Sequence, residues 1–321
     1  MEMKNQRHDI QQIKDALRRQ QASCMIGSGY SLNAKAKTKG TSRFPLWEEL
    51  TNILAAELYP ANAKARQNAV ASAGSSSGAL RLAEEFESAF GRNKLNQLLE
   101  DAIPNNLHEP ADVHTQLLEL PWVDVYTTNY DTLLERAASK IFQRNYMVVA
   151  QTQELPGSRR PRIIKLHGCF ERRQKYVITE EDFRRYANES AAFVNEFRVS
   201  LIENVFCLFG FSGDDPNFLQ WTGWVRDQLG KDAPYLYWFH FKNDLQTFQT
   251  RLLEDRRIIP IGMKELFPEF ENDYSSAFLA LFDQLHDESD EDGPTWNRRP
   301  LIDYKESKLS KRFRTNERTN Q

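Results

Sequence analysis

The sequence predicts an α/β protein with a doubly wound, mostly parallel sheet, and three observations support this. Six short apolar runs lie along the chain, at residues 23–29, 123–128, 162–168, 205–211, 236–240 and 258–263. Most hold apolar residues at successive positions, as strands covered on both faces must. Helical-looking segments separate the runs, and four of the runs end in glycine or polar residues, as strand-to-helix junctions do.

Local signals place helices between these strands. A proline precedes apolar residues at helical spacing over 46–58, and proline is tolerated in the first turn of a helix. Asp215, followed by proline, is expected to cap a helix that continues through the next apolar residues. Residues 179–182 are expected to form a capping box, and residues 132–135 a second one that starts a helix directly after the second strand.

The stretch of residues 41–120, between the first two strands, is too long for a simple crossover and predicts a helical insertion. Its glycine- and serine-rich residues 73–78 are expected to be a flexible loop. Such an insertion would cover the carboxyl edge of the sheet, where α/β proteins bind ligands. We therefore expect one domain over residues 1–286. The acidic run and basic segment of residues 287–321 predict a charged tail, a linker or a partner-docking arm.

Composition excludes several classes of partner. With 42 basic and 45 acidic residues, the net charge is −3, so the protein has no overall positive potential to attract nucleic acid or anionic lipid. The three cysteines, Cys24, Cys169 and Cys207, form no C-x-x-C pair, and the histidines lack metal-ligand spacing. We therefore expect no metal site and a reducing compartment. The chain shows no signal peptide and no run of about 20 apolar residues, so we expect a cytoplasmic protein without membrane contact.

The first strand ends in a glycine-rich turn. Gly27 and Gly29 lie one residue apart, and glycine lets backbone N–H groups approach a pyrophosphate closely. A third glycine of the G-x-G-x-x-G pattern is absent, because Leu32 occupies its position. An ordinary strand-to-helix turn would explain the two glycines equally well.

Three further strand ends carry polar groups. Thr128, Asn129 and Asp131 follow the second strand, and a helix cap would explain only one of them, which leaves Asn129 to hold a ribose hydroxyl or an attacking water. His167 ends the third strand and can take a proton near neutral pH. Ser212, between two glycines, follows the fourth. Because the carboxyl ends of parallel strands converge on one crevice, we expect these groups to meet there.

These motifs together resemble one family. G-S-G-Y-S, T-T-N-Y-D, K-L-H-G and G-F-S-G-D-D-P, in this order, resemble the G-A-G-x-S, T-Q-N-x-D, H-G and G-T/S-S pattern of the sirtuin (SIR2) superfamily. The resemblance covers residues 23–263. It implies that residues 1–286 form a Rossmann-like, sirtuin-like domain that binds NAD and is catalytic.

The resemblance also implies roles for individual residues. Nucleotide binding falls to Gly27, Ser28, Gly29 and Ser31, the nicotinamide-ribose site to Asn129 and Asp131, the general base to His167, and the adenosine-ribose loop to Gly210, Ser212 and Gly213. Thr128 stands where the family has glutamine, within the expected NAD-binding set. The large Tyr30 follows the glycines.

The departures from the family pattern indicate the activity. Deacetylating sirtuins carry two C-x-x-C pairs for a zinc module, which this sequence lacks. The chain therefore resembles the zinc-free sirtuin-like domains of bacterial antiphage defence, and the resemblance implies NAD hydrolysis to ADP-ribose and nicotinamide. Cyclisation is chemically close to hydrolysis. A non-catalytic NAD or ADP-ribose sensor and an NAD-dependent protein deacylase are the alternatives. Because uncontrolled hydrolysis would harm the host, we expect a homo-oligomer or a sensor or ATPase partner protein to control it.

Overall fold

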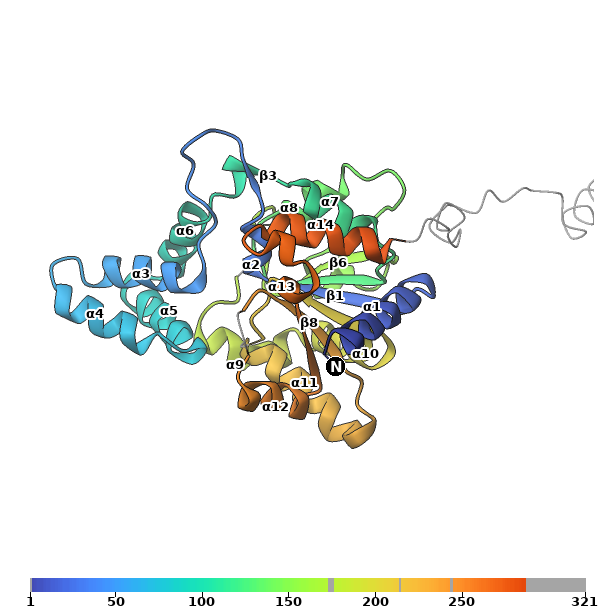
Figure 1. The fold of residues 1–321 in the computed structure, drawn as a ribbon. Helices are drawn as coiled ribbons and strands as arrows, with labels where there is room; N and C mark the ends of the chain where they lie inside the picture. Colours follow the sequence, from blue (N-terminus) through green and yellow to red (C-terminus); the bar gives the residue numbers. More distant parts are fainter. Residues whose placement is uncertain (1, 173–175, 214, 243–244, 287–321) are drawn as a thin grey trace, which may run out of the picture.

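The centre of the molecule is a parallel sheet. A computed structural model describes residues 2–172, 176–213, 215–242 and 245–286 (Figure 1), so the expected tail at 287–321 lies outside the described residues. Seven strands pair in the order β5-β6-β4-β1-β7-β8-β9, and every pair is parallel. The strands are β1 (Ala22–Ile26), β4 (Asp124–Thr127), β5 (Met147–Val149), β6 (Arg162–Lys165), β7 (Val205–Phe209), β8 (Leu236–His240) and β9 (Ile258–Gly262). The predicted doubly wound sheet is confirmed.

All six predicted strands are present, and one further strand of the large sheet was not predicted. β5 has only three residues and lies at the edge of the sheet, with Met147 exposed. A run this short shows neither apolar continuity nor alternation, so sequence periodicity cannot distinguish it from a loop. A small antiparallel pair, β2 (Lys35–Ala36) with β3 (His108–Glu109), was also not predicted.

Helices cover both faces of the sheet, as the apolar strands require. Cys24 and Ile26 pack into one core, and Met25, between them, packs into the other. The first core is closed by α1 (Glu2–Arg18), α7 (Asp112–Glu119), α8 (Leu133–Ala138) and α14 (Tyr274–Leu285). The second is closed by α9 (Glu180–Glu189), α10 (Ala191–Glu203) and α11 (Pro216–Leu229). Shorter helices are α2 (Ser28–Ser31), α12 (Thr247–Asp255) and α13 (Met263–Leu266).

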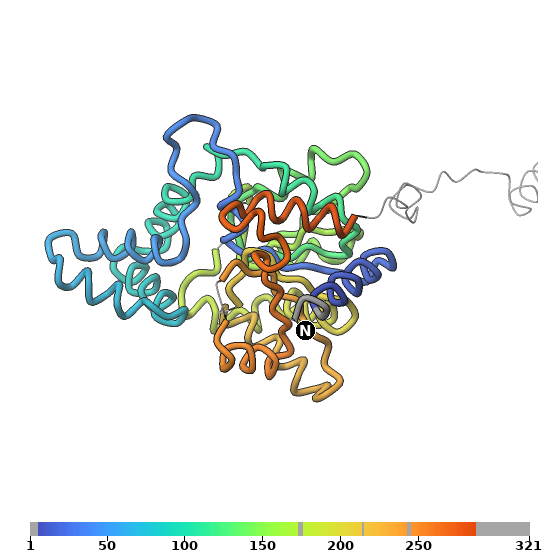
Figure 2. Tube along the Cα trace, in the orientation of Figure 1, coloured from blue at the N-terminus to red at the C-terminus, as the bar shows by residue number. Residues whose placement is uncertain are grey.

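The predicted insertion is a lobe of four helices beside the sheet (Figures 1 and 2). It consists of α3 (Trp47–Leu58), α4 (Ala63–Ser72), α5 (Ser76–Phe90) and α6 (Arg92–Ala102), which share a separate apolar core. The expected loop at 73–78 is wrong. Ser75 caps α5 by accepting from the Gly78 N–H, so only a short turn separates α4 from α5. α7 packs instead on α8 and α14, as the helix that leads into β4.

Two of the three predicted helix starts have the expected cap. Asp215 Oδ1 accepts from the Phe218 N–H at 3.0 Å at the start of α11. Thr179 and Asp182 bond reciprocally at the start of α9, with side chain to backbone distances of 3.2 and 3.1 Å. The expected capping box at 132–135 is wrong. α8 does begin there, but the N–H of its first residue is bonded by Asp131 Oδ1, because the Thr132 side chain bonds elsewhere.

Candidate active site

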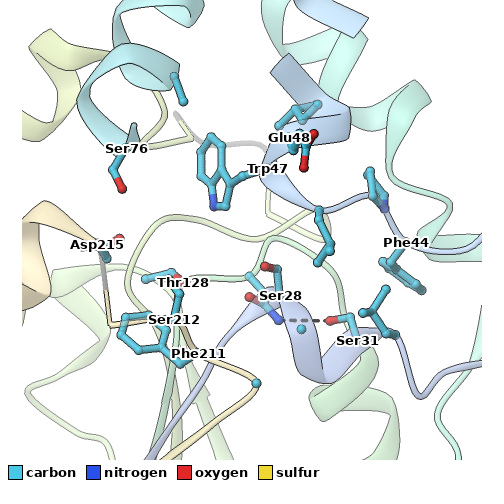
Figure 3. A pocket seen from close by; sticks show the side chains of 18 of the residues that line it. Ser28, Ser31, Phe44, Trp47, Glu48, Ser76, Thr128, Phe211, Ser212 and Asp215 are labelled. Atoms are coloured by element: carbon cyan, nitrogen blue, oxygen red, sulfur yellow. Dashed lines mark hydrogen bonds between the residues drawn. The ribbon is translucent and has the colours of Figure 1, made fainter. Parts of the chain in front are cut away.

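A cavity of about 1100 Å³ lies over the carboxyl ends of the central strands. The strand order reverses at β1, which has β4 on one side and β7 on the other, so the loops after these strands diverge and leave a crevice. The lobe forms the roof through α3 and the turn before α5. Figure 3 shows Trp47, Glu48 and Ser76 of the lobe facing Ser28 and Thr128 of the sheet edge.

Most of the predicted site residues meet in this cavity. Those that line it are Ser28, Gly29, Ser31, Thr128, Asn129, Asp131, His167, Gly210 and Ser212. Gly27 and Gly213 do not line it. Four strand ends therefore contribute to one cavity, as the convergence argument predicted.

The glycines allow two loops to pack backbone against backbone. A Cβ on Gly27 would lie 2.5 Å from the Gly210 carbonyl oxygen, and a Cβ on Gly210 would lie 2.2 Å from the Tyr30 nitrogen. Gly210 also has φ of +58°, which L-residues with side chains rarely adopt. The Gly29 N–H donates to the Gly210 carbonyl at 3.0 Å. Contact between the two loops therefore explains these glycines, and the Gly29 N–H is already bonded within the protein.

Hydrogen bonds fix the orientation of the Asn129 side chain. Its Nδ2 donates to the Gly27 carbonyl and to Ser31 Oγ, both at 3.0 Å, and Figure 3 marks the bond to Ser31. A carbonyl oxygen can only accept, so the amide nitrogen must face Gly27. Among the described residues, no donor reaches Asn129 Oδ1. The side chain therefore keeps one hydrogen-bond acceptor for a ligand, whereas its two N–H groups are already used.

Asp131 holds the turn together from behind. Its Oδ2 accepts from Ser31 Oγ at 2.8 Å, and its Oδ1 accepts from the Leu133 N–H at 3.1 Å. Beneath the turn, the buried ammonium of Lys165 donates to the Asp131 carbonyl and pairs with Glu135 at 2.9 Å. Burial opposes that charge, but the nearby Glu135 carboxylate raises the pKa of Lys165. The turn that carries Asn129 thus rests on buried, charged hydrogen bonds.

His167 is buried at the wall of the cavity. It is 1% exposed, and Phe183 and Tyr186 meet its ring edge-on at centroid distances of 5.0 and 5.6 Å. Its Nδ1 lies 4.0 Å from Asp215 Oδ2, and its Nε2 lies 3.5 Å from Asn217 Nδ2. Burial lowers the pKa of His167, although the Asp215 carboxylate acts in the opposite direction. The imidazole is therefore neutral at pH 7 and can accept a proton.

Sequence reasoning missed several residues of the site. Asp215 was predicted only as a helix cap, and the contact of Asn217 with His167 was not foreseen. Trp47 and Glu48 were assigned to a helix, but nothing in the local sequence indicates which face of that helix lines the cavity. Lys242, the only lysine or arginine in the described lining, follows β8, where no motif was singled out.

Comparison with known proteins relates part of the chain to one family. Residues 123–261 match the model of the SIR2-like domain. The matched segment includes Asn129, His167 and Ser212, and the glycine turn after β1 precedes it.

Curated relatives of this chain carry related names. An NAD(+) hydrolase ThsA of Enterococcus faecium is 27% identical over 216 residues, covering 65% of this chain and 40% of that protein. One of Acinetobacter baumannii (strain 532279) is 33% identical over 134 residues, covering 40% and 27%. Defense-associated sirtuin 2 of Bacillus subtilis is 24% identical over 312 residues, covering 95% and 29%. The chain thus matches 27% to 40% of the length of these relatives.

A chain from a structural study of the mechanism and regulation of Sir2 enzymes aligns with 87% of this chain and 97% of its own length, at 12% identity and a TM-score of 0.39. In the described part of the chain, no three His, Cys, Asp or Glu side chains are grouped to hold a metal. None of the helices described there combines the length and apolar character needed to cross a bilayer.

Proposed function

We propose that this chain hydrolyses the bond between nicotinamide and ribose in NAD, giving ADP-ribose and nicotinamide. The observation that carries the proposal is the meeting of the Asn129 amide oxygen and the neutral His167 imidazole at one cavity of a SIR2-like domain. At about 1100 Å³, the cavity is slightly larger than the roughly 300–1000 Å³ usual for small-molecule sites, and a dinucleotide is a large ligand of this class. The relatives named NAD(+) hydrolase support the same substrate.

Cleavage of the bond between nicotinamide and ribose requires few catalytic groups. The nicotinamide nitrogen of NAD is cationic, so it leaves as a neutral molecule with the electron pair of the glycosidic bond and needs no acid. The ribose C1′ becomes positively charged, and the oxygen of a water forms the new bond to it. The remaining tasks are to hold the ribose, exclude bulk water and remove one proton.

The residues of the cavity match these tasks. Asn129 Oδ1 can accept a hydrogen bond from a ribose hydroxyl or from the attacking water, because its amide is already locked by Gly27 and Ser31. His167 takes the proton from the water or from a ribose hydroxyl. Asp131 keeps the turn rigid. Ser28 and Thr128 line the same wall and offer hydroxyl groups to the substrate.

The names of the relatives extend the proposal to bacterial defence. A chain that hydrolyses NAD would deplete the cell of NAD, so we infer that its activity is inhibited until infection. Self-assembly or a partner protein, such as a sensor or an ATPase, would supply this control. The relatives are much longer than the matched region, which leaves room in them for regulatory parts.

Chromatography of NAD incubated with purified protein tests the proposal. Wild type should release nicotinamide and ADP-ribose in equal amounts, over a range of protein concentrations that reveals any need for assembly. His167→Ala should reduce the rate by about 10² to 10⁴, the usual value of a general base. Asn129→Ala should also reduce it strongly, because the ribose or the attacking water is no longer oriented. Intact NAD with wild type at every concentration, or equal rates in wild type and His167→Ala, would refute it.

A further inference from the structure

Both ring nitrogens of His167 face the amino end of α11. Asp215 is the N-cap of that helix, and Asn217 is in its first turn. Asp215 Oδ2 lies 4.0 Å from Nδ1, and Asn217 Nδ2 lies 3.5 Å from Nε2. The imidazole is 1% exposed and Asn217 is 3% exposed, so little water is available to replace either contact.

The chemistry of the two neighbours selects one tautomer. An amide N–H₂ group can only donate, so Nε2, which faces Asn217, must carry the lone pair. The proton of neutral His167 then resides on Nδ1, on the side of the Asp215 carboxylate. At 4.0 Å the interaction is longer than a hydrogen bond and acts through charge, which still favours a polarised N–H in a buried site.

Asp215 is held in place for this role. Its Oδ1 accepts from the Phe218 N–H at 3.0 Å, as the cap of a 14-residue helix, which directs Oδ2 toward His167. The other carboxylate near the imidazole, Asp182 of α9, is already paired with Arg92 at 2.8 Å. Asp215 has no ion pair with any described lysine or arginine, so its charge is available to the imidazole.

We propose that Asp215 is a positioning residue that, together with Asn217, holds His167 in the Nδ1–H tautomer and so makes Nε2 the basic atom. The proposal deepens the proposed function, because it identifies the atom that receives the proton. In the resting site the Asn217 amide donates to this lone pair, so its oxygen must turn toward Nε2 when the proton arrives. The ring is then cationic, and the Asp215 carboxylate stabilises that charge. No covalent step at Asp215 is involved.

The groups around the imidazole predict a pH effect. From α9, Asp182 is paired with Arg92, and the Tyr186 hydroxyl donates to the Leu166 carbonyl at 2.7 Å. From α11, Asn217 is neutral, so Asp215 supplies the unpaired charge. A carboxylate favours the protonated imidazole and raises its pKa, so removing the charge lowers that pKa. Since the neutral form is the active base, the acidic limb of kcat/KM should then move to lower pH.

Asp215→Asn tests the proposal, because asparagine is an equally good N-cap and keeps the bond to the Phe218 N–H. Asp215→Ser is a second variant that retains the cap without a carboxylate. Asp273→Asn is the matched control, since Asp273 caps α14 in the same way, with Ser276 N–H at 3.0 Å. NMR of imidazole nitrogens in the full chain, with His167→Gln to assign the signal, reads tautomer and pKa without any substrate.

In wild type and Asp273→Asn, the His167 signals should report mainly Nδ1–H. In Asp215→Asn and Asp215→Ser, the Nε2–H share should rise and the midpoint of titration should fall by about one pH unit. The rate of NAD cleavage should fall about 10-fold with little change in KM. An unchanged tautomer and midpoint in both folded Asp215 variants would overturn the proposal, even if wild type cleaves NAD. If wild type leaves NAD intact, the proposed function fails, and the imidazole signals alone decide the tautomer.

Discussion

Buried polar groups are hydrogen-bonded differently at the two edges of the central sheet. At the amino edge, Asp124 begins β4 and is fully buried, and Arg162 begins β6 beside it. The guanidinium donates to both carboxylate oxygens at 2.7 and 2.8 Å, and Glu196 completes the cluster. At the carboxyl edge, Asn129 and His167 are also held by neighbours, but no donor in the described part of the chain reaches Asn129 Oδ1, and the two residues line a cavity. Polar groups that bond one another fully, as at the amino edge, indicate a structural cluster. Polar groups at a cavity that can still accept a hydrogen bond or a proton indicate a binding site.

Arg162→Met should produce the largest change in stability. The substitution leaves the Asp124 carboxylate buried without its main partner, which is expected to lower the free energy of unfolding by about 3 to 5 kcal/mol. The cleavage rate per folded molecule should stay near that of wild type, because the cluster lies at the opposite edge from the cavity. Urea denaturation and activity below the transition check both parts. A large loss of rate in fully folded protein would contradict the assignment of a structural role to the amino edge and a catalytic role to the carboxyl edge.

Lys165→Met sharpens the comparison, because this charge is buried but lies directly beneath the active turn. Removing it leaves Glu135 unpaired and the Asp131 carbonyl without its donor, so a loss of about 3 kcal/mol is expected. The rate should fall as well, since Asn129 belongs to the same turn. Thermal unfolding and nicotinamide release measure the two effects. Lost stability with an unchanged rate would mean that Lys165, like Arg162, has only a structural role.

Buried histidines should make the fold sensitive to acid. Burial lowers the pKa of His114 from 6.5 to about 4, and its Nδ1 accepts from the Ala111 N–H at 3.2 Å. Between these values the unfolded chain binds a proton that the folded chain does not, so stability is present above pH 6.5 and falls as the pH drops toward 4. His114→Gln keeps an acceptor for Ala111. Between pH 6.5 and 4, the free energy of unfolding of the variant should fall by roughly 3 kcal/mol less than that of wild type, as measured by denaturation at each pH. Parallel stability profiles for the two proteins would contradict the assignment.

Loss of a helix cap should have the smallest effect. Thr179→Ala removes the acceptor for the Asp182 N–H at the start of α9, which is expected to lower stability by about 1 kcal/mol. Thr179→Ser keeps the acceptor and is the matched control. Since Phe183 of α9 contacts His167, a modest loss of rate is expected in the same samples. Equal stability of the alanine and serine variants would show that the cap contributes nothing.

The sequence predicted the sheet well because strands buried on both faces are continuous apolar runs, as in β7 and β8. It failed at β5, which is too short to show a pattern, and at residues 73–78. There the glycine and serine content suggested a loop, although Ser75 is a helix cap. The cavity residues were found because parallel strands bring their carboxyl ends together. The contact between Asp215 and His167, which are far apart in sequence, depends on how α11 packs and leaves no local signal.

The most direct test measures nicotinamide release by wild type, His167→Ala and Arg162→Met at saturating NAD, at a temperature where circular dichroism shows all three folded. The account predicts that Arg162→Met, although the least stable, retains a rate near that of wild type. His167→Ala, although folded, should lose about 10² to 10⁴ in rate. Substantial cleavage by His167→Ala, or none by wild type at any protein concentration, would contradict it.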